Sequence, residues 1–364
     1  MNITIVAGAR PNFMKIAPII KAIENKKVEG ININYRLVHT GQHYDKNLSD
    51  TFFEELSIPR PDINLEVKSG TQAEQTAAIM IGFEKELKSH PCDMVIVVGD
   101  VTSTMACTIV AKKAGVDVAH VEAGIRSGDM GMPEEINRIV TDSLTDYFFT
   151  TSSYANENLQ NLGVKDSQIF FIGNVMIDTL RQQENRLKKP NLWKELELKK
   201  GGYLVMTLHR PSNVDEQQLL KSIIEKIVEL ADSFPIIFPV HPRTRKILED
   251  MNLSFRNLHY VNPLGYLEFN YLIKNALGVL TDSGGITEET TVMNIPCITL
   301  RDNTERPETC EIGTNVLVGN NPDKIEFAMK KMLSGNWKQG QIPYLWDGKA
   351  ASRLVNVLVN IYSL

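Results

Sequence analysis

Carboxylate side chains gather in a short central part of the chain. The segment HVEAGIRSGDMGMPEEINR at residues 120–138 contains Glu122, Glu134 and Glu135. VVGDVTST, shortly before it, adds Asp100. Carboxyl groups whose pKa values are set by burial or by neighbouring charges can act as general acids and bases. The spacing therefore predicts proton-transfer chemistry, and we interpret Glu135 as a solvated residue at the start of a helix.

Two other segments have the character of phosphate sites. TDSGG places Ser283, Gly284 and Gly285 between an apolar run and a predicted helix, where glycines let backbone N–H groups approach a phosphate. GARPNFMK places Arg10 and Lys15 around the start of another predicted helix, where two cations suit a pyrophosphate. A tight turn would also explain the first segment, and ordinary surface charge would also explain the second. Neither segment alone therefore establishes a phosphate site.

A pair of glutamates follows the glycine segment. Glu288 and Glu289 fall in the first turns of the predicted helix. A carboxylate there would interact favourably with the helix dipole. It would equally hold the two hydroxyls of a ribose, and position in the sequence is compatible with both interpretations.

Histidines also follow predicted strands, as His209 in TLHRPSN and His241 in FPVHPRT. A single histidine at such a point is more often structural, and the chain has no HExxH motif or clustered His/Cys spacing, so we expect no metal site. The GxGxxG and GxxxxGK[ST] fingerprints are also missing. Taken together, the residues indicate a nucleoside-diphosphate compound that is converted by acid–base chemistry without a cofactor.

Short, almost continuous apolar runs must position these side chains. Such runs suit parallel strands that are buried on both faces, and helical patterns between them predict strand–helix–strand units with right-handed crossovers. Ligands of open α/β sheets bind beyond the carboxyl ends of the strands. The predicted strands are 3–10, 35–43, 94–100, 118–124, 147–153, 203–210, 235–242, 278–285 and 296–302.

The strand–helix pattern occurs twice, on either side of a lysine-rich stretch at 181–202. We therefore predict two Rossmann-like doubly wound α/β domains that face a cleft and share one site. The first domain is expected at 1–175 and the second, which would bind the nucleotide, at 176–349. The final apolar helix pattern, 350–364, could pack on either domain, including back on the first.

Composition sets further limits. The chain has 364 residues, of which 43% are hydrophobic and 23% charged, and this length favours two domains over one core. A net charge of -5 argues against a nucleic-acid surface. No segment reaches about 18 uninterrupted apolar residues, so we expect a cytoplasmic protein that does not span a membrane. The four cysteines form no CxxC motif and are expected to be reduced thiols.

Many separated motifs occur in a fixed order along the chain: GARPNFMKIAP, HTGQHYD, VVGDVTST, HVEAGIRSGD, PEEINR, TLHRPSN, HPRT, TDSGGITEET and RDNTERPE. Together they resemble one known family, the non-hydrolysing UDP-N-acetylglucosamine 2-epimerases. The resemblance implies a fold of the glycosyltransferase-B type, the interconversion of UDP-GlcNAc and UDP-ManNAc, and a homodimer. It extends from position 1 to about 320.

The resemblance also implies roles for individual residues. Asp100, Glu122 and Glu134 would be the acid–base set, and His209 would face the diphosphate or the leaving group. The residues implied to contact the UDP-sugar are Arg10, Lys15, Phe269 against the uracil, Ser283, Gly284 and Gly285 at the phosphates, Glu289 at the ribose and Arg306 at the diphosphate end. An allosteric site found in many family members is not expected, because residues 69–72 offer no arginine.

The implied chemistry explains why no redox cofactor is expected. UDP would leave C1 of the sugar, which makes the C2 proton acidic, and elimination would give 2-acetamidoglucal. Re-addition with protonation of the opposite face would invert C2. Alternatives that the residues leave open are the same chemistry on UDP-2,3-diacetamido-glucuronic acid, a hydrolysing epimerase that releases ManNAc and UDP, a glycosyltransferase, and a UDP-sugar-binding regulator.

Overall fold

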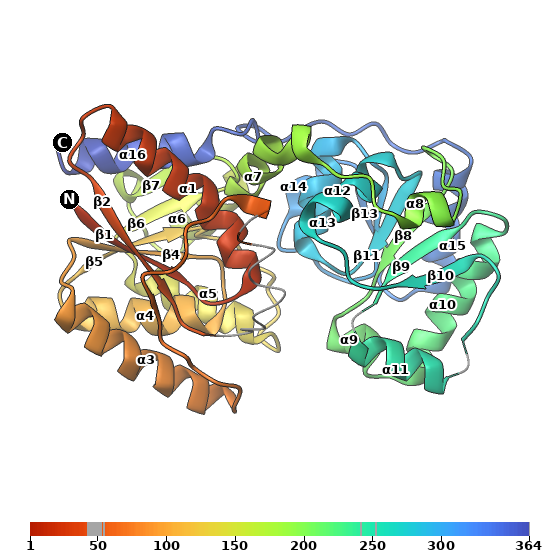
Figure 1. Cartoon of the computed structure of the whole chain (residues 1–364), viewed down its shortest axis with the longest axis horizontal. Helices are drawn as coiled ribbons and strands as arrows, with labels where there is room; N and C mark the ends of the chain where they lie inside the picture. Colours follow the sequence, from red (N-terminus) through yellow and green to blue (C-terminus); the bar gives the residue numbers. More distant parts are fainter. Residues whose placement is uncertain (42–52, 54, 241, 252, 364) are drawn as a thin grey trace. The chain divides into compact units, whose positions relative to one another are not determined.

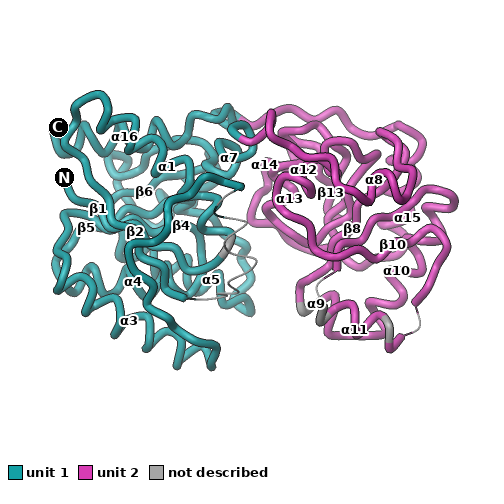
Figure 2. The backbone as a smooth tube through the Cα atoms, viewed as in Figure 1, with its two compact units in different colours: residues 1–182, 344–364 teal, residues 183–343 magenta. Residues whose placement is uncertain are grey.

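The computed structural model describes residues 1–41, 53, 55–240, 242–251 and 253–363. Figure 1 follows the chain through its elements, and Figure 2 separates two compact units, residues 1–182 with 344–364 (unit 1) and residues 183–343 (unit 2). The predicted domain boundary follows residue 175, and the two compact units divide after Gln182. His241 and most of the GQHYDKN segment fall outside the described residues, as does the side chain of Arg10.

Unit 1 is built on a parallel sheet of seven strands in the order β3-β2-β1-β4-β5-β6-β7. The helices α3, α4 and α5 pack side by side on one face, and α1 and α16 pack together on the other (Figure 1). The strands are β1 (Asn2–Ala7), β2 (Asn34–His39), β3 (Ile63–Asn64), β4 (Met94–Val98), β5 (Asp117–Val121), β6 (Tyr147–Thr150) and β7 (Ile169–Phe171). The helices are α1 (Arg10–Val28), α3 (Gln72–Ser89), α4 (Thr102–Lys113), α5 (Pro133–Leu144), α6 (Ser153–Asn161), α7 (Val175–Gln183) and α16 (Ala350–Ile361).

Unit 2 repeats this architecture with six parallel strands in the order β10-β9-β8-β11-β12-β13. The strands are β8 (Leu204–Thr207), β9 (Ile236–Pro239), β10 (Leu258–Val261), β11 (Gly278–Thr281), β12 (Cys297–Thr299) and β13 (Asn315–Leu317). The helices are α8 (Leu192–Glu195), α9 (Pro211–Val214), α10 (Gln217–Ala231), α11 (Pro242–Asp250), α12 (Tyr266–Asn275), α13 (Gly284–Met293), α14 (Pro307–Glu311) and α15 (Pro322–Leu333). The prediction of two doubly wound α/β domains is confirmed.

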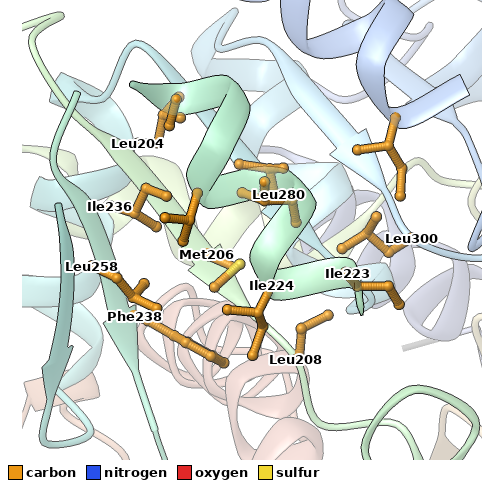
Figure 3. Packing of buried hydrophobic residues seen from close by; sticks show 14 of the residues in the cluster. Leu204, Met206, Leu208, Ile223, Ile224, Ile236, Phe238, Leu258, Leu280 and Leu300 are labelled. Atoms are coloured by element: carbon orange, nitrogen blue, oxygen red, sulfur yellow. The ribbon is translucent and has the colours of Figure 1, made fainter. Parts of the chain in front are cut away.

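The period-2 geometry of strand β8 explains how its sheet is covered on both faces. Leu204 and Met206 point to one face, where they join a cluster with α10 and α15 residues (Figure 3). Val205 points to the other face, where it joins a second cluster with residues of α8 and α12. Successive side chains of a strand alternate between faces, so an apolar run fills two cores at once. This is why the strands read as continuous apolar segments.

The final helix returns to unit 1. The Asp178 carboxylate on α7 accepts hydrogen bonds from the first two N–H groups of α16, at 3.0 Å from Ala350 N and 2.8 Å from Ala351 N. Asp178 is buried, and this burial raises its pKa from 3.8 to about 6, although the two N–H donors oppose the rise. The carboxylate thus supplies the partners that the start of a helix lacks.

This raised pKa gives the stability of the protein a defined dependence on pH. Between about pH 4 and pH 6 the folded carboxyl binds its proton more tightly than the unfolded one, so stability falls as pH rises through that window. We expect wild type to lose about 1–3 kcal/mol there relative to Asp178→Asn, whose amide does not titrate. Urea unfolding of both proteins at several pH values measures the difference, and a constant difference would contradict the assignment.

All four cysteines lie in the described part of the chain, and the structure pairs none of them in a disulfide. Within the same residues, no helix combines the length and apolar character that are needed to cross a membrane.

Candidate active site

In unit 1, a buried ion pair joins the start of α1 to the end of β5. The Lys15 ammonium lies 2.6 Å from a Glu122 carboxylate oxygen, and only 2% of the Glu122 side chain is exposed. The Asn12 side chain fixes the start of α1, because it accepts from Gly8 N and Ala9 N and donates to Val98 O. The lysine therefore offsets a carboxylate charge that would be costly to bury alone.

The backbone around Glu122 is held in an unusual conformation. Glu122 has a φ of 70°, in the left-handed region that non-glycine residues seldom adopt. Gly99, at the end of β4, has a φ of 66°. A Cβ added to Gly99 would lie 2.9 Å from the Lys15 ammonium, so only glycine allows the lysine to pass this close. Strain of this kind is characteristic of functional sites.

Asp100 is held by two neighbouring residues of α5. An Arg138 N–H donates to the Asp100 carboxylate, and Asn137 donates to its backbone carbonyl at 2.8 Å. The other arm of Arg138 contacts Glu135 at 2.8 Å. The helix therefore connects Asp100 to a second carboxylate through one buried guanidinium.

The interpretation of Glu135 as a solvated residue is wrong. Glu135 is buried and accepts hydrogen bonds from Ser127 N, Ser127 Oγ and Gly128 N at 3.0–3.1 Å. Burial acts to raise the pKa of Glu135, but these hydrogen bonds and Arg138 hold it below its ordinary value. Its neighbour Glu134, predicted to be catalytic, is half-buried at the second residue of α5.

In unit 2, Asp282 ties the glycine segment to the histidine segment. Asp282 is fully buried and accepts hydrogen bonds from His209 N, Arg210 N and the Asn213 side chain at 2.9–3.2 Å. The exposed imidazole of His209 lies 2.7 Å from Asp282 Oδ1. Burial acts to raise the pKa of Asp282, and its contacts with His209 and Arg210 lower it overall. The arrangement places His209 beside Ser283.

The predicted phosphate segment forms the start of α13. Ser283 is the N-cap residue, and Gly284 and Gly285 are the first two helical residues. These three residues are half-exposed, so they are accessible to a ligand. A Cβ on Gly284 would lie 3.8 Å from a Glu305 carboxylate oxygen, an ordinary van der Waals contact, so a side chain would fit at this turn without a clash. Its N–H groups have no partner within the helix and suit an anion.

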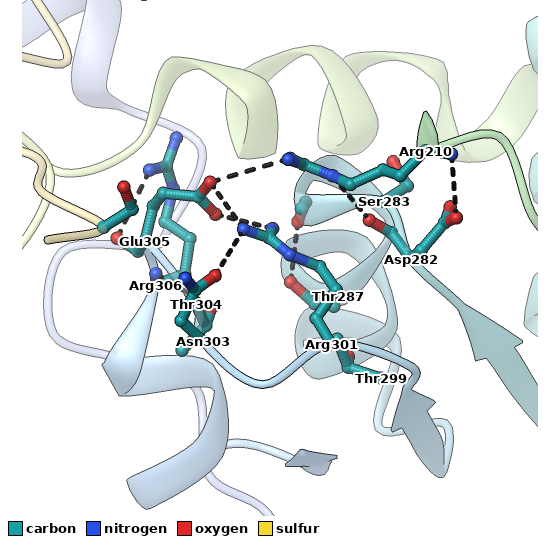
Figure 4. A network of polar contacts seen from close by, with 12 residues as sticks. Arg210, Asp282, Ser283, Thr287, Thr299, Arg301, Asn303, Thr304, Glu305 and Arg306 are labelled. Carbon is teal, nitrogen blue, oxygen red and sulfur yellow. Dashed lines mark hydrogen bonds and ion pairs between the residues drawn. The ribbon is translucent and has the colours of Figure 1, made fainter. Parts of the chain in front are cut away.

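Three arginines lie around this helix start (Figure 4). Arg301 forms a two-pronged contact with Glu305, with both N–O distances 2.8 Å, and Arg210 lies 3.6 Å from the same carboxylate. Arg306 donates to Glu288 of α13. Positive charge is therefore concentrated beside the first turn of α13, although much of it is balanced by carboxylates within the protein.

Two buried carboxyls in this region have strongly raised pKa values. Burial raises the pKa of Glu289 to about 7, and Glu288 adds to the effect, against hydrogen bonds from Tyr266 and Asn270. Tyr266 Oη lies 2.9 Å from the Glu289 carboxylate. Burial likewise raises the pKa of Glu308 to about 7, against the charge of Arg306. Both carboxyls can therefore exchange protons near neutral pH.

Phe269 lies on α12, half-buried against the apolar cluster that contains Trp193 and Tyr203. Its predicted contact with uracil stays a prediction, as do the roles of the other site residues. Among the described residues, no group of three His, Cys, Asp or Glu side chains could hold a metal ion.

The structure adds partners that sequence reasoning missed. Four of these partners contact a predicted site residue from another segment, namely Asn137 and Arg138 at Asp100, Tyr266 at Glu289 and Asp282 at His209. Asp282 had a sequence signal, because it directly precedes SGG at the end of a strand.

Comparison with known proteins gives a consistent result. The family model described as UDP-N-acetylglucosamine 2-epimerase matches residues 25–359. A UDP-N-acetylglucosamine 2-epimerase of Methanocaldococcus jannaschii is 43% identical, over 98% of this chain and 99% of that protein. A UDP-2,3-diacetamido-2,3-dideoxy-D-glucuronate 2-epimerase of Pseudomonas aeruginosa is 38% identical, over 99% of this chain and 100% of that protein.

A solved structure extends the comparison to three dimensions. The crystal structure of the Methanocaldococcus jannaschii UDP-GlcNAc 2-epimerase in complex with UDP-GlcNAc and UDP matches with a TM-score of 0.88 and 42% sequence identity. The match covers 99% of this chain and 100% of that one. The carboxylates at the strand ends of unit 1 and the cation-rich helix start of unit 2 thus occur in a chain that belongs to the UDP-N-acetylglucosamine 2-epimerase family.

Proposed function

We propose that this protein interconverts UDP-GlcNAc and UDP-ManNAc by reversible epimerisation at C2, without net hydrolysis. The observation that carries the proposal is the pairing of two kinds of site in one chain. Unit 1 holds Glu122 and Asp100 beside fixed cations, and unit 2 holds a glycine helix start beside arginines. The first suits proton transfer and the second suits a diphosphate. The names of the similar enzymes support the same substrate class.

The proposed reaction begins with departure of UDP from C1. Arg306, His209 and the N–H groups at the start of α13 would stabilise the negative charge that develops on the diphosphate. One carboxylate of the set Asp100, Glu122 and Glu134 would remove the C2 proton, which gives 2-acetamidoglucal. A second group of the set would deliver a proton to the opposite face as UDP re-adds to C1. Arg10 and Lys15 would contact the substrate.

The test is proton NMR of UDP-GlcNAc with purified protein in deuterated water. Loss of the C2 proton signal, together with the appearance of UDP-ManNAc and an intact phosphate linkage, is the expected result. Release of free ManNAc and UDP would instead identify a hydrolysing enzyme. Turnover of UDP-2,3-diacetamido-glucuronic acid alone would move the assignment to that sugar, which the Pseudomonas relative makes the second candidate. No turnover of either sugar would refute the proposal.

Glu289 gives UDP binding an expected dependence on pH. In the free protein, burial raises the pKa of Glu289 to about 7. If the ionised carboxylate holds the ribose, each binding event below about pH 7 releases a proton, and affinity falls up to about tenfold per pH unit. Calorimetric titration with UDP between about pH 5.5 and pH 8.5 measures this slope. Glu289→Gln should flatten it, and an unchanged slope in that variant would contradict the assignment.

A variant of Glu308 must be measured in the same experiment as a control. Its pKa is also raised to about 7, so it would titrate over the same range. Glu308→Gln should retain the slope if Glu289 alone is linked to ribose binding. A slope that is lost only in Glu308→Gln would move the linkage to that residue.

We also propose that the protein forms a homodimer through unit 1. The usual amphipathic pattern is reversed in helix α5. Its buried residues include Glu135, Arg138 and Asp142, whereas Ile136 and Ile139 are 45% and 36% exposed. Apolar side chains that face water on such a helix are characteristic of an interface. Light scattering should give a dimer for wild type and a monomer for the Ile136→Asp, Ile139→Asp double variant. Val28→Asp, at another exposed apolar residue, should leave the dimer intact.

A further inference from the structure

A fully buried histidine, His120, connects the ends of strands β4 and β5 in unit 1. His120 lies on β5, and its side chain is 0% exposed. Its Nε2 atom lies 2.8 Å from the carbonyl oxygen of Gly99, the residue before Asp100. Its Nδ1 atom lies 2.7 Å from Oδ1 of Asp142 on α5. One imidazole therefore spans the end of β4 and the helix that carries Arg138.

The partners of this ring determine how many protons it carries. A backbone carbonyl oxygen can only accept a hydrogen bond, so Nε2 must carry a proton. The second proton lies between Nδ1 and the Asp142 carboxylate. Asp142 Oδ2 accepts from Gly124 N at 3.1 Å and lies 2.7 Å from the Arg126 guanidinium, and both contacts favour an ionised carboxylate. Nδ1 must then donate to Asp142, which makes the ring an imidazolium.

The charges on the surrounding elements agree with this assignment. Burial acts to raise the pKa of Asp142, but the charges of His120 and Arg126 lower it overall. Beyond Asp142 and Arg126, the ionised groups described around Gly99 and Asp100 include the Lys15–Glu122 pair and Arg138, whose other arm contacts Glu135. A buried positive charge on His120 is thus balanced at 2.7 Å by Asp142.

The His120–Asp142 pair contacts a part of the backbone with several residues of positive φ. Gly99, Glu122 and Gly124 all have positive φ, at 66°, 70° and 77°. His120 fixes the carbonyl of Gly99, and Asp142 fixes the N–H of Gly124. The pair therefore holds the residues on either side of Glu122, together with the peptide that leads into Asp100.

We propose that His120 is a positioning residue with a proton on each ring nitrogen, which with Asp142 as its counterion holds Asp100 and Glu122 in the geometry required for proton transfer at C2. It touches neither substrate nor reacting atoms and acts through Gly99 and Gly124. The kinetic part of this inference rests on the proposed function, whereas the charge state of the ring does not.

The charge state is tested by nitrogen-15 NMR of wild-type protein labelled at histidine, with ring signals assigned through bonds to the backbone. At about pH 8, where an ordinary histidine is neutral, both ring nitrogens of His120 should carry protons. His39 is the internal control, because its Nδ1 accepts from Gly41 N at 2.6 Å and burial lowers its pKa to about 4, so it must be neutral. A singly protonated His120 ring would overturn the inference.

Two variants test the proposed positioning role of His120. His120→Gln keeps a donor for Gly99 but removes the cation, so kcat should fall by about tenfold or more with KM little changed. The acid limb of the pH profile should move to higher pH, because a cation that stabilised nearby carboxylates is lost. Asp142→Asn should give a singly protonated His120 ring in the NMR spectrum. Folding of both variants is checked by circular dichroism.

The outcomes separate this inference from the proposed function. Unchanged kcat and pH profile in folded His120→Gln would overturn the positioning role. An imidazolium in an inactive wild-type protein would refute the proposed epimerisation and leave the charge assignment standing. A His120 ring that stays doubly protonated in Asp142→Asn would overturn the role of Asp142 as counterion.

Discussion

Glu122→Gln should reduce kcat for epimerisation by about 10³-fold while UDP affinity stays close to that of wild type. A general acid or base contributes about 10²–10⁴-fold to a reaction, and glutamine keeps the shape of the side chain but cannot exchange a proton. UDP affinity should be retained because the predicted diphosphate residues Ser283, Gly284 and Arg306 all belong to unit 2. Steady-state kinetics and calorimetric titration with UDP measure the two quantities.

Glu86 offers a matched control for this substitution. It is also a buried glutamate of unit 1 paired with a cation, with Arg36 Nε at 2.5 Å from its carboxylate. Glu86→Gln should therefore reproduce the loss of a buried charge without touching the proposed acid–base set. Equal losses of kcat in both variants would show that Glu122 acts only through stability, and full activity of Glu122→Gln would remove it from the mechanism.

The strands that sequence reasoning missed are all at the edges of the two sheets. β3 and β7 end the sheet of unit 1, and β10 and β13 end that of unit 2. Edge strands are less buried, and most residues of these four are only half-buried, so they leave no continuous apolar run. The central strands β4 and β8 are almost fully buried and were predicted. Burial on both faces is what makes a strand visible in sequence.

The site was predictable in part for a related reason. Residues directly after central strands, such as Asp100, Glu122 and Ser283, could be found because the ends of parallel strands meet at one edge. Their partners could not, since which cation meets which carboxylate depends on how distant segments pack. Glu135 was misjudged because α5 turns its charged side, which includes Glu135 and Arg138, inward toward Asp100, contrary to the usual amphipathic pattern.

Loss of the Arg301–Glu305 pair of unit 2 should have a large effect on stability. Both side chains are nearly buried, at 6% and 4% exposed, and their contact is two-pronged. Removing one member of such a pair leaves an uncompensated buried charge, which costs about 3–5 kcal/mol. Glu305→Ala should therefore destabilise unit 2 by about that amount. Urea unfolding followed by the fluorescence of Trp193 and Trp337, both in unit 2, measures it.

A double variant separates the cost of an unpaired charge from the worth of the pair. Replacing both members by apolar residues, as in Arg301→Met with Glu305→Leu, should recover most of the lost stability, because no buried charge is left alone. Glu326→Gln is the control: its carboxylate pairs with Lys226 and Lys330 at the surface, so unfolding should be unchanged. If the double variant is as unstable as Glu305→Ala, the loss comes from packing. If the double variant is stable but binds UDP poorly, the charges of the pair beside α13 contribute to UDP binding.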